Sequence, residues 1–273
     1  MSESVQTLLD CRYGNGHLLD NSPVNAVIEG LLRHRSVRRF SDQPLPEGIL
    51  QTLVAAAQSA STSSNLQLWS LVAVHDPQRK ERLSRLAGNQ KHIIAAPLFL
   101  VWLADLSRIS RMAERESMTL EGVPYLECFL MASVDAALAA QNAVVALESL
   151  GLGAVFVGGI RNDISAVAAE LALPQEVYPV FGMSIGVPDP SHPSQIKPRL
   201  SQAAVVHGEQ YATDEEVAAI ADYDKRQGDF YAEHGLQGTD WSCHVLARLQ
   251  TVQALTGRDQ LTEKLHRLGF GLR

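Results

Sequence analysis

Cysteine is scarce in this sequence, and the cysteines present form no recognisable pattern. Cys11, Cys128 and Cys243 are three in number and far apart, and no C-x-x-C pair occurs. A disulfide framework, on which many small secreted domains depend, is therefore excluded, and so is a dithiol redox motif. This cysteine usage is typical of a protein in the reducing cytoplasm, which is the location we expect.

Clusters of metal-binding residues are also lacking. None of the nine histidines belongs to an H-E-x-x-H motif. Glu263 and His266 form a single E-x-x-H pair, whereas di-iron carboxylate sites need two such pairs. We therefore expect no metal site in this protein.

The chain has neither an excess of positive charge nor a secretory segment. Its formal net charge of −7 disfavours nucleic acid as a partner and favours small molecules. The N-terminal residues carry early acidic side chains and no continuous apolar stretch, so we expect no signal peptide. Hydrophobic residues make up 46 % of the 273 positions, which is enough to bury a full core.

The longest apolar stretch runs from residue 126 to residue 150 and predicts one long helix. It contains no Pro or Gly, and Gly151 and Gly153 follow it as a stop signal. Apolar residues surround nearly the whole circumference, which indicates burial on all sides. Asp135, Gln141 and Asn142 lie in mid-span, where a lipid-facing helix would have to desolvate them. We therefore expect a core helix and no membrane span.

Shorter apolar segments predict a mixed α/β layer fold. Four of them read as buried strands, over residues 69–75, 96–104, 151–160 and 177–187. Amphipathic helices are expected after Pro46 and over residues 24–33, 78–87, 163–173 and 214–234. The charged segment 106–122 reads as a mobile excursion, and the final forty residues as peripheral helices.

Two basic elements are candidate anion sites. The run from Arg33 to Arg39 contains four arginines, a histidine and a serine, and Lys197 and Arg199 flank a proline in a second loop. Arginine binds phosphate oxygens through two parallel hydrogen bonds, so an enclosed pair of such segments would hold a phosphate. The alternative for the run from Arg33 to Arg39 is a solvated basic surface.

Two further stretches allow both a binding and a structural interpretation. The hydroxyl-rich loop 61–67 has donors for a polar ring or a phosphate, but its composition also suits a flexible linker. Gly158 and Gly159 end an apolar segment where the missing side chains would let a flat ligand approach the backbone. The segment is not a dinucleotide fingerprint, because Phe156 stands where the third glycine is needed.

Residues 182–186 match G-x-S-x-G, the motif around the nucleophile of serine hydrolases. The motif requires a strand, a sharp turn and then a helix around the serine. Here Ser184 is followed by an apolar segment that continues towards Pro188, so the required context is missing. A hydrolase that uses Ser184 remains a minor alternative.

Several separated motifs resemble, in order, those of the FMN-dependent, oxygen-insensitive NAD(P)H nitroreductase family. They are RHRSVRRF, SSNLQLW, GNQKH, AAQNAVVALESLGLGAVFVGGIRND, KPRL, YDKRQGDFY and DWSCH. The likeness is greatest to the A-type branch, which includes flavin and chromate reductases. It implies an α+β sandwich with a mixed, mainly antiparallel sheet around the long buried helix, in a homodimer whose two interfacial clefts bind FMN.

The resemblance also implies domains and site residues. We divide the chain into an N-terminal extension of doubtful order (residues 1–24), an FMN-binding core (25–200) and a C-terminal helical extension that wraps the dimer (201–273). The implied FMN-binding residues are His34, Arg35, Ser36, Arg38, Thr62, Ser63, Gln90, Phe156, Val157, Gly158, Gly159, Lys197 and Arg199. Arg38 would lie at the N1/O2 edge of the ring, where a cation favours the reduced cofactor.

The implied activity is reduction of nitroaromatics, quinones or free flavin by NAD(P)H in two hydride transfers through FMN N5, with no catalytic side chain. Small flat aromatic acceptors would be the partners. Members that prefer NADPH commonly have arginines in the loop after the YDKRQGDFY-like helix, but residues 233–240 contain none. The preference between NADPH and NADH is therefore left open, and His34 or the arginines Arg108, Arg111 and Arg115 of segment 106–122 are the alternative residues for binding a 2′-phosphate. A non-enzymatic flavin-binding or anion-binding module is the second alternative.

Overall fold

The computed structural model describes residues 5–14 and 23–273, and by its internal contacts the chain forms two units. The helical unit comprises Met1–Arg35 and Ser194–Leu255. The sheet unit comprises Ser36–Pro193 and Thr256–Arg273. The three-part division expected from the sequence stays a prediction, and its residues 1–4 and 15–22 lie outside the described chain.

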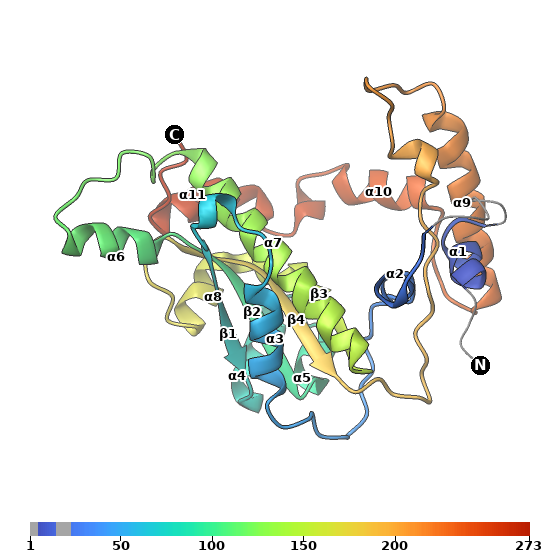
Figure 1. Cartoon of the computed structure of the whole chain (residues 1–273), viewed down its shortest axis with the longest axis horizontal. Helices are drawn as coiled ribbons and strands as arrows, with labels where there is room; N and C mark the ends of the chain where they lie inside the picture. The colour runs from blue at the N-terminus through green and yellow to red at the C-terminus, as the bar shows by residue number, and fades with distance from the viewer. Residues whose placement is uncertain (1–4, 15–22) are drawn as a thin grey trace. The chain divides into compact units, whose positions relative to one another are not determined.

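A four-stranded antiparallel sheet forms the centre of the sheet unit (Figure 1). Its strands are β1 (Trp69–Val74), β2 (Leu98–Asp105), β3 (Gly153–Val157) and β4 (Val177–Gly186), in the order β1-β2-β4-β3. All four expected strands are confirmed. The expectation of a mixed sheet is wrong for the described residues, because each of the three strand pairs is antiparallel.

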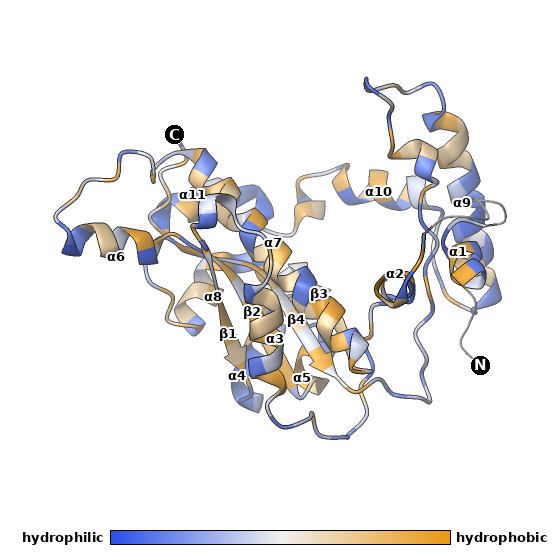
Figure 2. Ribbon diagram, in the orientation of Figure 1, coloured by the Kyte–Doolittle hydropathy of each residue, from blue (hydrophilic) through white to orange (hydrophobic). Residues whose placement is uncertain are grey.

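Strand β2 is buried along its whole length, and its side chains alternate between two core clusters. Leu98, Leu100 and Trp102 face α3 (Ile49–Gln58) and α7 (Leu126–Ser149). Phe99, Val101 and Leu103 pack with residues of α4 (Pro77–Leu86), α5 (Lys91–Ala95) and α8 (Ile164–Glu170). Helices therefore cover both faces of the sheet. The strands and α7 are mostly coloured as hydrophobic in Figure 2.

Local signals define where these helices begin and end. Asp76 caps α4 by accepting from the N–H groups of Gln78 and Arg79, with Pro77 at the first helical position. Asp163 caps α8 by accepting from the Ala166 N–H. At the end of α7, Gly151 has φ +75° and donates to Glu148, while Leu152 donates to Leu147. This is the hydrogen-bond pattern of a glycine-terminated helix, and it confirms the expected stop.

Helix α7 is the long helix that the sequence predicts, but only part of its surface is buried. By length and composition alone this helix could cross a membrane. In its most apolar stretch of 18 residues, 44 % of the residues are buried inside the protein. Leu126, Leu130, Val134 and Leu138 are 43–54 % exposed. These residues follow one another at four-residue spacing and form one stripe, which we call the α7 stripe. The expectation of burial on all sides is therefore wrong for the single chain.

Two segments differ from what the sequence suggested: one is more ordered, and the other is more deeply buried. The charged excursion contains α6 (Ser107–Arg115), and Arg108 fastens it by donating to the carbonyls of Gln67 and Trp69 and to the Ser70 hydroxyl. The chain end is not peripheral, because α11 (Leu261–Arg267) and the residues after it pack in a third core cluster. Its members include Leu265, Leu268, Phe270 and Tyr178. The short helices η1 (Ser63–Asn65), η2 (Gly158–Asp163) and η5 (Arg258–Gln260) complete this unit.

The helical unit contains α1 (Val5–Tyr13), α2 (Ala26–Leu32), α9 (Glu216–Glu233) and α10 (Trp241–Leu249), with the short helices η3 (Gln202–Ala204) and η4 (Gln253–Leu255). Asn25 caps α2. In α1, Leu8, Leu9 and Arg12 are buried, so the expected doubtful order is wrong for residues 5–13. The backbone N–H and the hydroxyl of Ser242, in α10, both donate hydrogen bonds to the carboxylate of Asp224, in α9, and these bonds join the two helices.

Candidate functional site

The second half of the basic run is fixed to the sheet by backbone bonds. The Val37 N–H donates to the Ala154 carbonyl (2.9 Å), and the Asp189 N–H donates to the Arg39 carbonyl (3.1 Å). The Val37 side chain fills the space beside Gly153, where an added Cβ would lie 2.6 Å from a Val37 methyl. This glycine is therefore needed for the run to lie against β3. Arg38 and Arg39 remain exposed.

Arg38 lies in the electrostatic environment of a partly buried histidine. His92, in α5, places Nε2 3.1 Å from Gln90 Oε1 and Nδ1 3.2 Å from Ser184 Oγ. Burial, and secondly the positive charge of Arg38, lower the pKa of His92. A neutral His92 that donates from Nε2 to Gln90 and accepts at Nδ1 from Ser184 fits these contacts. The predicted ring contact, Gln90, is thereby held by His92.

Ser184 is a structural residue of β4. Its side chain is fully buried, and β4 runs on through Ile185 to Gly186 without the turn that a nucleophile elbow needs. Although Ser184 contacts His92, the partner of the second imidazole nitrogen is the neutral amide of Gln90 and not a carboxylate. The structure therefore does not support the hydrolase alternative.

Replacing Arg38 with alanine should raise the pKa of His92 towards its ordinary value of about 6.5, without reaching it because burial persists. The neutral form is the favoured one in the fold, so the wild-type protein loses stability as the pH falls through about 6.5, and the variant should lose less. NMR titration of the imidazole signals measures this shift. Arg39→Ala, which removes the neighbouring exposed cation, is the control. An unchanged His92 pKa in Arg38→Ala would contradict the assigned proximity.

The hydroxyl-rich loop is organised around a buried carboxylate. Asp135 of α7 is 2 % exposed and accepts from Thr62 Oγ1 (2.5 Å), from the Ser63 N–H (3.1 Å) and from the Leu68 N–H (3.0 Å). Thr62 in turn accepts from the Gln67 N–H (2.9 Å). The flexible-linker interpretation is therefore wrong. The hydroxyl hydrogens of Thr62 and Ser63 are already donated, the latter to Met131 Sδ.

The segment from Phe156 to Gly159 spans the end of β3 and the start of η2. Phe156 is 38 % exposed and packs edge-to-face against Phe181, with ring centroids 5.1 Å apart. At Gly159 an added Cβ would lie 2.3 Å from the Ala87 carbonyl, so this glycine is required by packing against the segment after α4. At Gly158 the nearest atom would be the Arg161 guanidinium at 3.4 Å, which is ordinary contact. Of the glycine pair, Gly158 alone leaves room beside the backbone.

The other predicted cations lie in the helical unit, where hydrogen bonds hold the Lys197–Arg199 loop. The carbonyl of Lys197 accepts from Arg12 (2.9 Å), that of Pro198 from Tyr223 (3.1 Å), and that of Arg199 from Arg226 (3.2 Å). The Lys197 and Arg199 side chains are exposed, as is Arg35. The loop is therefore rigid in its backbone and presents two cations.

The predicted site residues fall in both units. His34, Arg35, Lys197 and Arg199 belong to the helical unit, and Ser36, Arg38, Thr62, Ser63, Gln90 and Phe156–Gly159 to the sheet unit. Three residues that form hydrogen bonds to these site residues or their segments were not predicted from the sequence: Arg12, His92 and Asp135. Only Asp135 had a signal in the sequence, because a charged residue in the middle of an apolar helix usually has a structural or functional reason.

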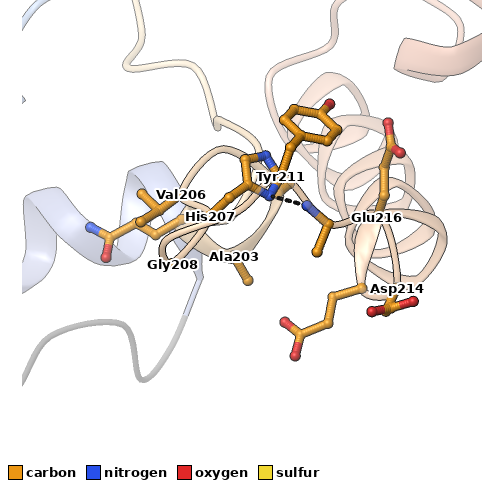
Figure 3. A pocket seen from close by; sticks show the side chains of 11 residues that line it. Ala203, Val206, His207, Gly208, Tyr211, Asp214 and Glu216 are labelled. Carbon is orange, nitrogen blue, oxygen red and sulfur yellow. Dashed lines mark hydrogen bonds between the residues drawn. The ribbon is translucent and has the colours of Figure 1, made fainter.

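One surface pocket, of about 450 Å³, lies in the helical unit between η3, the segment that follows it and the start of α9 (Figure 3). The rings of His207 and Tyr211 lie 4.1 Å apart, and His207 Nδ1 accepts from the Ala212 N–H. Asp214, Glu215 and Glu216 also line this pocket, and their charge repels a phosphate. It contains none of the predicted site residues. Among the described residues no group of three or more His, Cys, Asp or Glu side chains has the arrangement of a metal site.

Comparison with known proteins gives matches along nearly the whole chain. The model of the nitroreductase family matches residues 31–187, and that of the family's C-terminal domain matches residues 197–273. The FMN reductase (NADPH) of Bacillus subtilis is 40 % identical over 246 residues, which cover 88 % of this chain and 98 % of the relative. The oxygen-insensitive NADPH nitroreductase of Salmonella typhimurium is 36 % identical over 252 residues, covering 92 % and 100 %.

Solved structures agree with these sequence matches. The NfrA1 nitroreductase from B. subtilis superposes with a TM-score of 0.83 and 39 % identity, over 90 % of this chain and 99 % of that one. The NADPH:FMN oxidoreductase from Vibrio harveyi, solved in complex with NAD+, gives a TM-score of 0.80 and 34 % identity, over 91 % and 100 %. The α+β fold expected from the sequence is confirmed.

Proposed function

Because this chain belongs to the nitroreductase family, we propose that it is an FMN-dependent NAD(P)H oxidoreductase that reduces flat aromatic acceptors such as nitroaromatics, quinones or free flavin. Relatives with 40 % and 36 % identity are named as an NADPH-dependent FMN reductase and an NADPH nitroreductase. The single structural observation that carries the proposal is the rigid Lys197–Arg199 loop, which presents exposed cations beside the segment of His34 and Arg35.

The chemistry of these residues fits FMN. The FMN phosphate is a dianion at neutral pH, and it requires cations and hydrogen-bond donors on a backbone that does not have to be reorganised on binding. Arg35, Lys197 and Arg199 supply the cations, and His34 and Ser36 supply further polar atoms. For the flavin ring, Gln90, Arg38 and the segment from Phe156 to Gly158 provide polar edges and a flat lining.

When bound, FMN supplies the redox chemistry by accepting a hydride from NAD(P)H at N5 and passing it to the acceptor. The protein residues orient and bind the reactants. Asp135 fixes the loop of Thr62 and Ser63, and because their hydroxyl hydrogens are already donated, we propose that these two residues meet FMN through backbone groups and lone pairs. No side chain has to act as nucleophile, in agreement with the burial of Ser184.

Of the three arginines of α6, Arg115 remains a candidate for binding the nicotinamide donor, whereas the other two already make hydrogen bonds within the chain. Arg108 is committed to Gln67, Trp69 and Ser70, and Arg111 donates to Ser107 Oγ, so these two arginines hold α6 and cannot serve a 2′-phosphate without breaking those bonds. The loop 233–240 has no arginine. We therefore propose NADPH as a donor on the basis of the relatives, with weaker discrimination against NADH than an arginine fork would give.

We further propose that the protein is a homodimer and that the α7 stripe is part of the interface. The stripe is apolar and about half exposed in one chain, which is unfavourable in water and is relieved by a second copy. The cysteine pattern supports the cytoplasm as the location.

Introducing charge into the α7 stripe should dissociate the dimer. Leu130→Glu combined with Val134→Glu removes two apolar side chains from the interface, worth roughly 1.5–3 kcal/mol each, so the dimer should weaken at least about a hundredfold. Gel filtration with light scattering gives the mass. Met112→Glu, at an exposed apolar residue of α6, is the control and should leave a dimer. A wild-type monomer would contradict the proposal.

Absorbance spectroscopy tests the proposed activity. The purified protein, with FMN added, should show flavin bands that bleach on anaerobic addition of NADPH and recover on addition of a quinone or nitroaromatic acceptor. A parallel experiment with NADH compares the two donors. Flavin binding without bleaching would identify a non-enzymatic flavin-binding module, and absence of flavin binding would refute the cofactor assignment.

A further inference from the structure

Arg12 is a buried arginine of α1 that contacts both cationic segments of the helical unit. It is 5 % exposed, and α1 lies before residue 31, where the family match begins. Its guanidinium donates to three backbone carbonyls, those of Leu32 (3.0 Å), His34 (2.5 Å) and Lys197 (2.9 Å). One planar group thus joins the segment of His34 and Arg35 to the loop of Lys197 and Arg199.

The backbone of Arg12 makes a second connection to the same loop. Its carbonyl accepts from the Arg199 N–H (2.7 Å) and from Arg226 Nη1 (3.3 Å). Arg226 Nη1 also donates to the Arg199 carbonyl (3.2 Å). The loop is therefore fixed on one side by α1, through Arg12, and on the other by α9, through Tyr223 and Arg226.

We propose that Arg12 is a positioning residue for the FMN phosphate: it holds the backbones of the two cationic segments together before the phosphate binds. This inference rests on the proposed FMN function, and it assigns a role in cofactor binding to the N-terminal helix. Two segments that each carry flexible cations bind a dianion well only if the backbones that carry them are already in place. The buried guanidinium of Arg12, which donates to three carbonyls, keeps these backbones in place. Its positive charge also adds to the positive potential at the proposed phosphate site.

The test compares FMN with riboflavin, which has the same ring but no phosphate. Arg12→Met keeps the apolar stem and removes the fork. Because the variant loses hydrogen bonds that order the phosphate-binding cations, its dissociation constant for FMN should rise by about tenfold or more. Its dissociation constant for riboflavin should stay within about twofold of the wild-type value, since the ring-binding residues are untouched. Quenching of flavin fluorescence measures both.

Two controls separate geometry from charge and from folding. Arg85→Met removes an exposed, ion-paired arginine and should leave both affinities unchanged, which corrects for the loss of one positive charge. Arg12→Lys keeps the charge but cannot reach three carbonyls through one fork, so it should weaken FMN binding less than Arg12→Met but measurably. If Arg12→Met does not fold, Arg12→Lys carries the comparison.

A readout without cofactor completes the test. In the FMN-free protein, amide hydrogen exchange over residues 33–35 and 197–199 should be faster in the Arg12 variants than in the wild type. Equal losses of FMN and riboflavin affinity, an unchanged FMN affinity or unchanged exchange would each overturn the role of Arg12. Failure of the wild-type protein to bind FMN would instead refute the proposed function, and so the two failures are distinguishable.

Discussion

Replacing Asp135 with leucine is expected to lower the free energy of unfolding by about 3 kcal/mol or more, because three donors lose a buried acceptor. The Leu68 N–H belongs to a residue that is 1 % exposed, so it loses its acceptor inside the core, whereas the Thr62 hydroxyl and the Ser63 N–H are partly buried. For a chain of this size the midpoint of thermal unfolding should fall by roughly 6–12 °C. Differential scanning calorimetry or circular dichroism measures the change.

Two further variants test the cause of this loss. Asp135→Asn keeps one oxygen that accepts, but it turns an amide group towards a donor, so its effect should be smaller than that of leucine and still clear. Glu127→Leu, at an exposed carboxylate of the same helix, should cost less than about 1 kcal/mol. Equal effects of Asp135→Leu and Glu127→Leu would show that the buried hydrogen bonds do not hold the loop.

Removing both cations of the Lys197–Arg199 loop should nearly abolish retention of FMN. A hydrogen bond to a charged group contributes about 1.5–3 kcal/mol, so each of Lys197→Met and Arg199→Met should weaken FMN binding by about 10- to 100-fold. The double variant should lose roughly 100- to 10,000-fold if the two effects add. Fluorescence titration at two salt concentrations measures the loss and its electrostatic part.

The control for this pair is a second double variant that removes the same charge elsewhere. Arg85 and Arg267 are exposed and each pairs with a glutamate one turn away, so their replacement with methionine should leave FMN affinity nearly unchanged. An equal loss in both double variants would mean that net charge, and not a phosphate site, governs binding. A loss of riboflavin affinity as large as that for FMN would also contradict the assignment.

The layers of the sheet unit were predictable because their signals are local. Each of the four strands is a short apolar segment between turn residues, and α7 is a long run without Gly or Pro that ends at Gly151. The motifs of the resemblance are local as well, since each is a run of residues in fixed order. They identified the family, although no single motif is specific.

Predictions failed where packing, rather than local pattern, decides the structure. Helix α6 carries many charges and few apolar residues, and it is held by Arg108, whose acceptors lie 38–41 positions earlier. The final forty residues were expected to be peripheral helices, but Leu265 and Phe270 near the end of the chain pack with Tyr178 of β4 in a core cluster. The single-chain exposure of α7 was missed because an apolar circumference does not reveal which side faces a neighbour.

The sequence by itself determined the family of this protein, the positions of its cations, its long helix and its strands. Only the tertiary structure decided which residues fix the segments that carry the candidate site. Asp135 meets Thr62 across 73 positions, Arg12 meets Lys197 across 185, and Ser184 is buried where its motif suggested exposure. A hydrogen bond between distant residues leaves no periodic pattern in the chain, because its geometry exists only once the layers have packed.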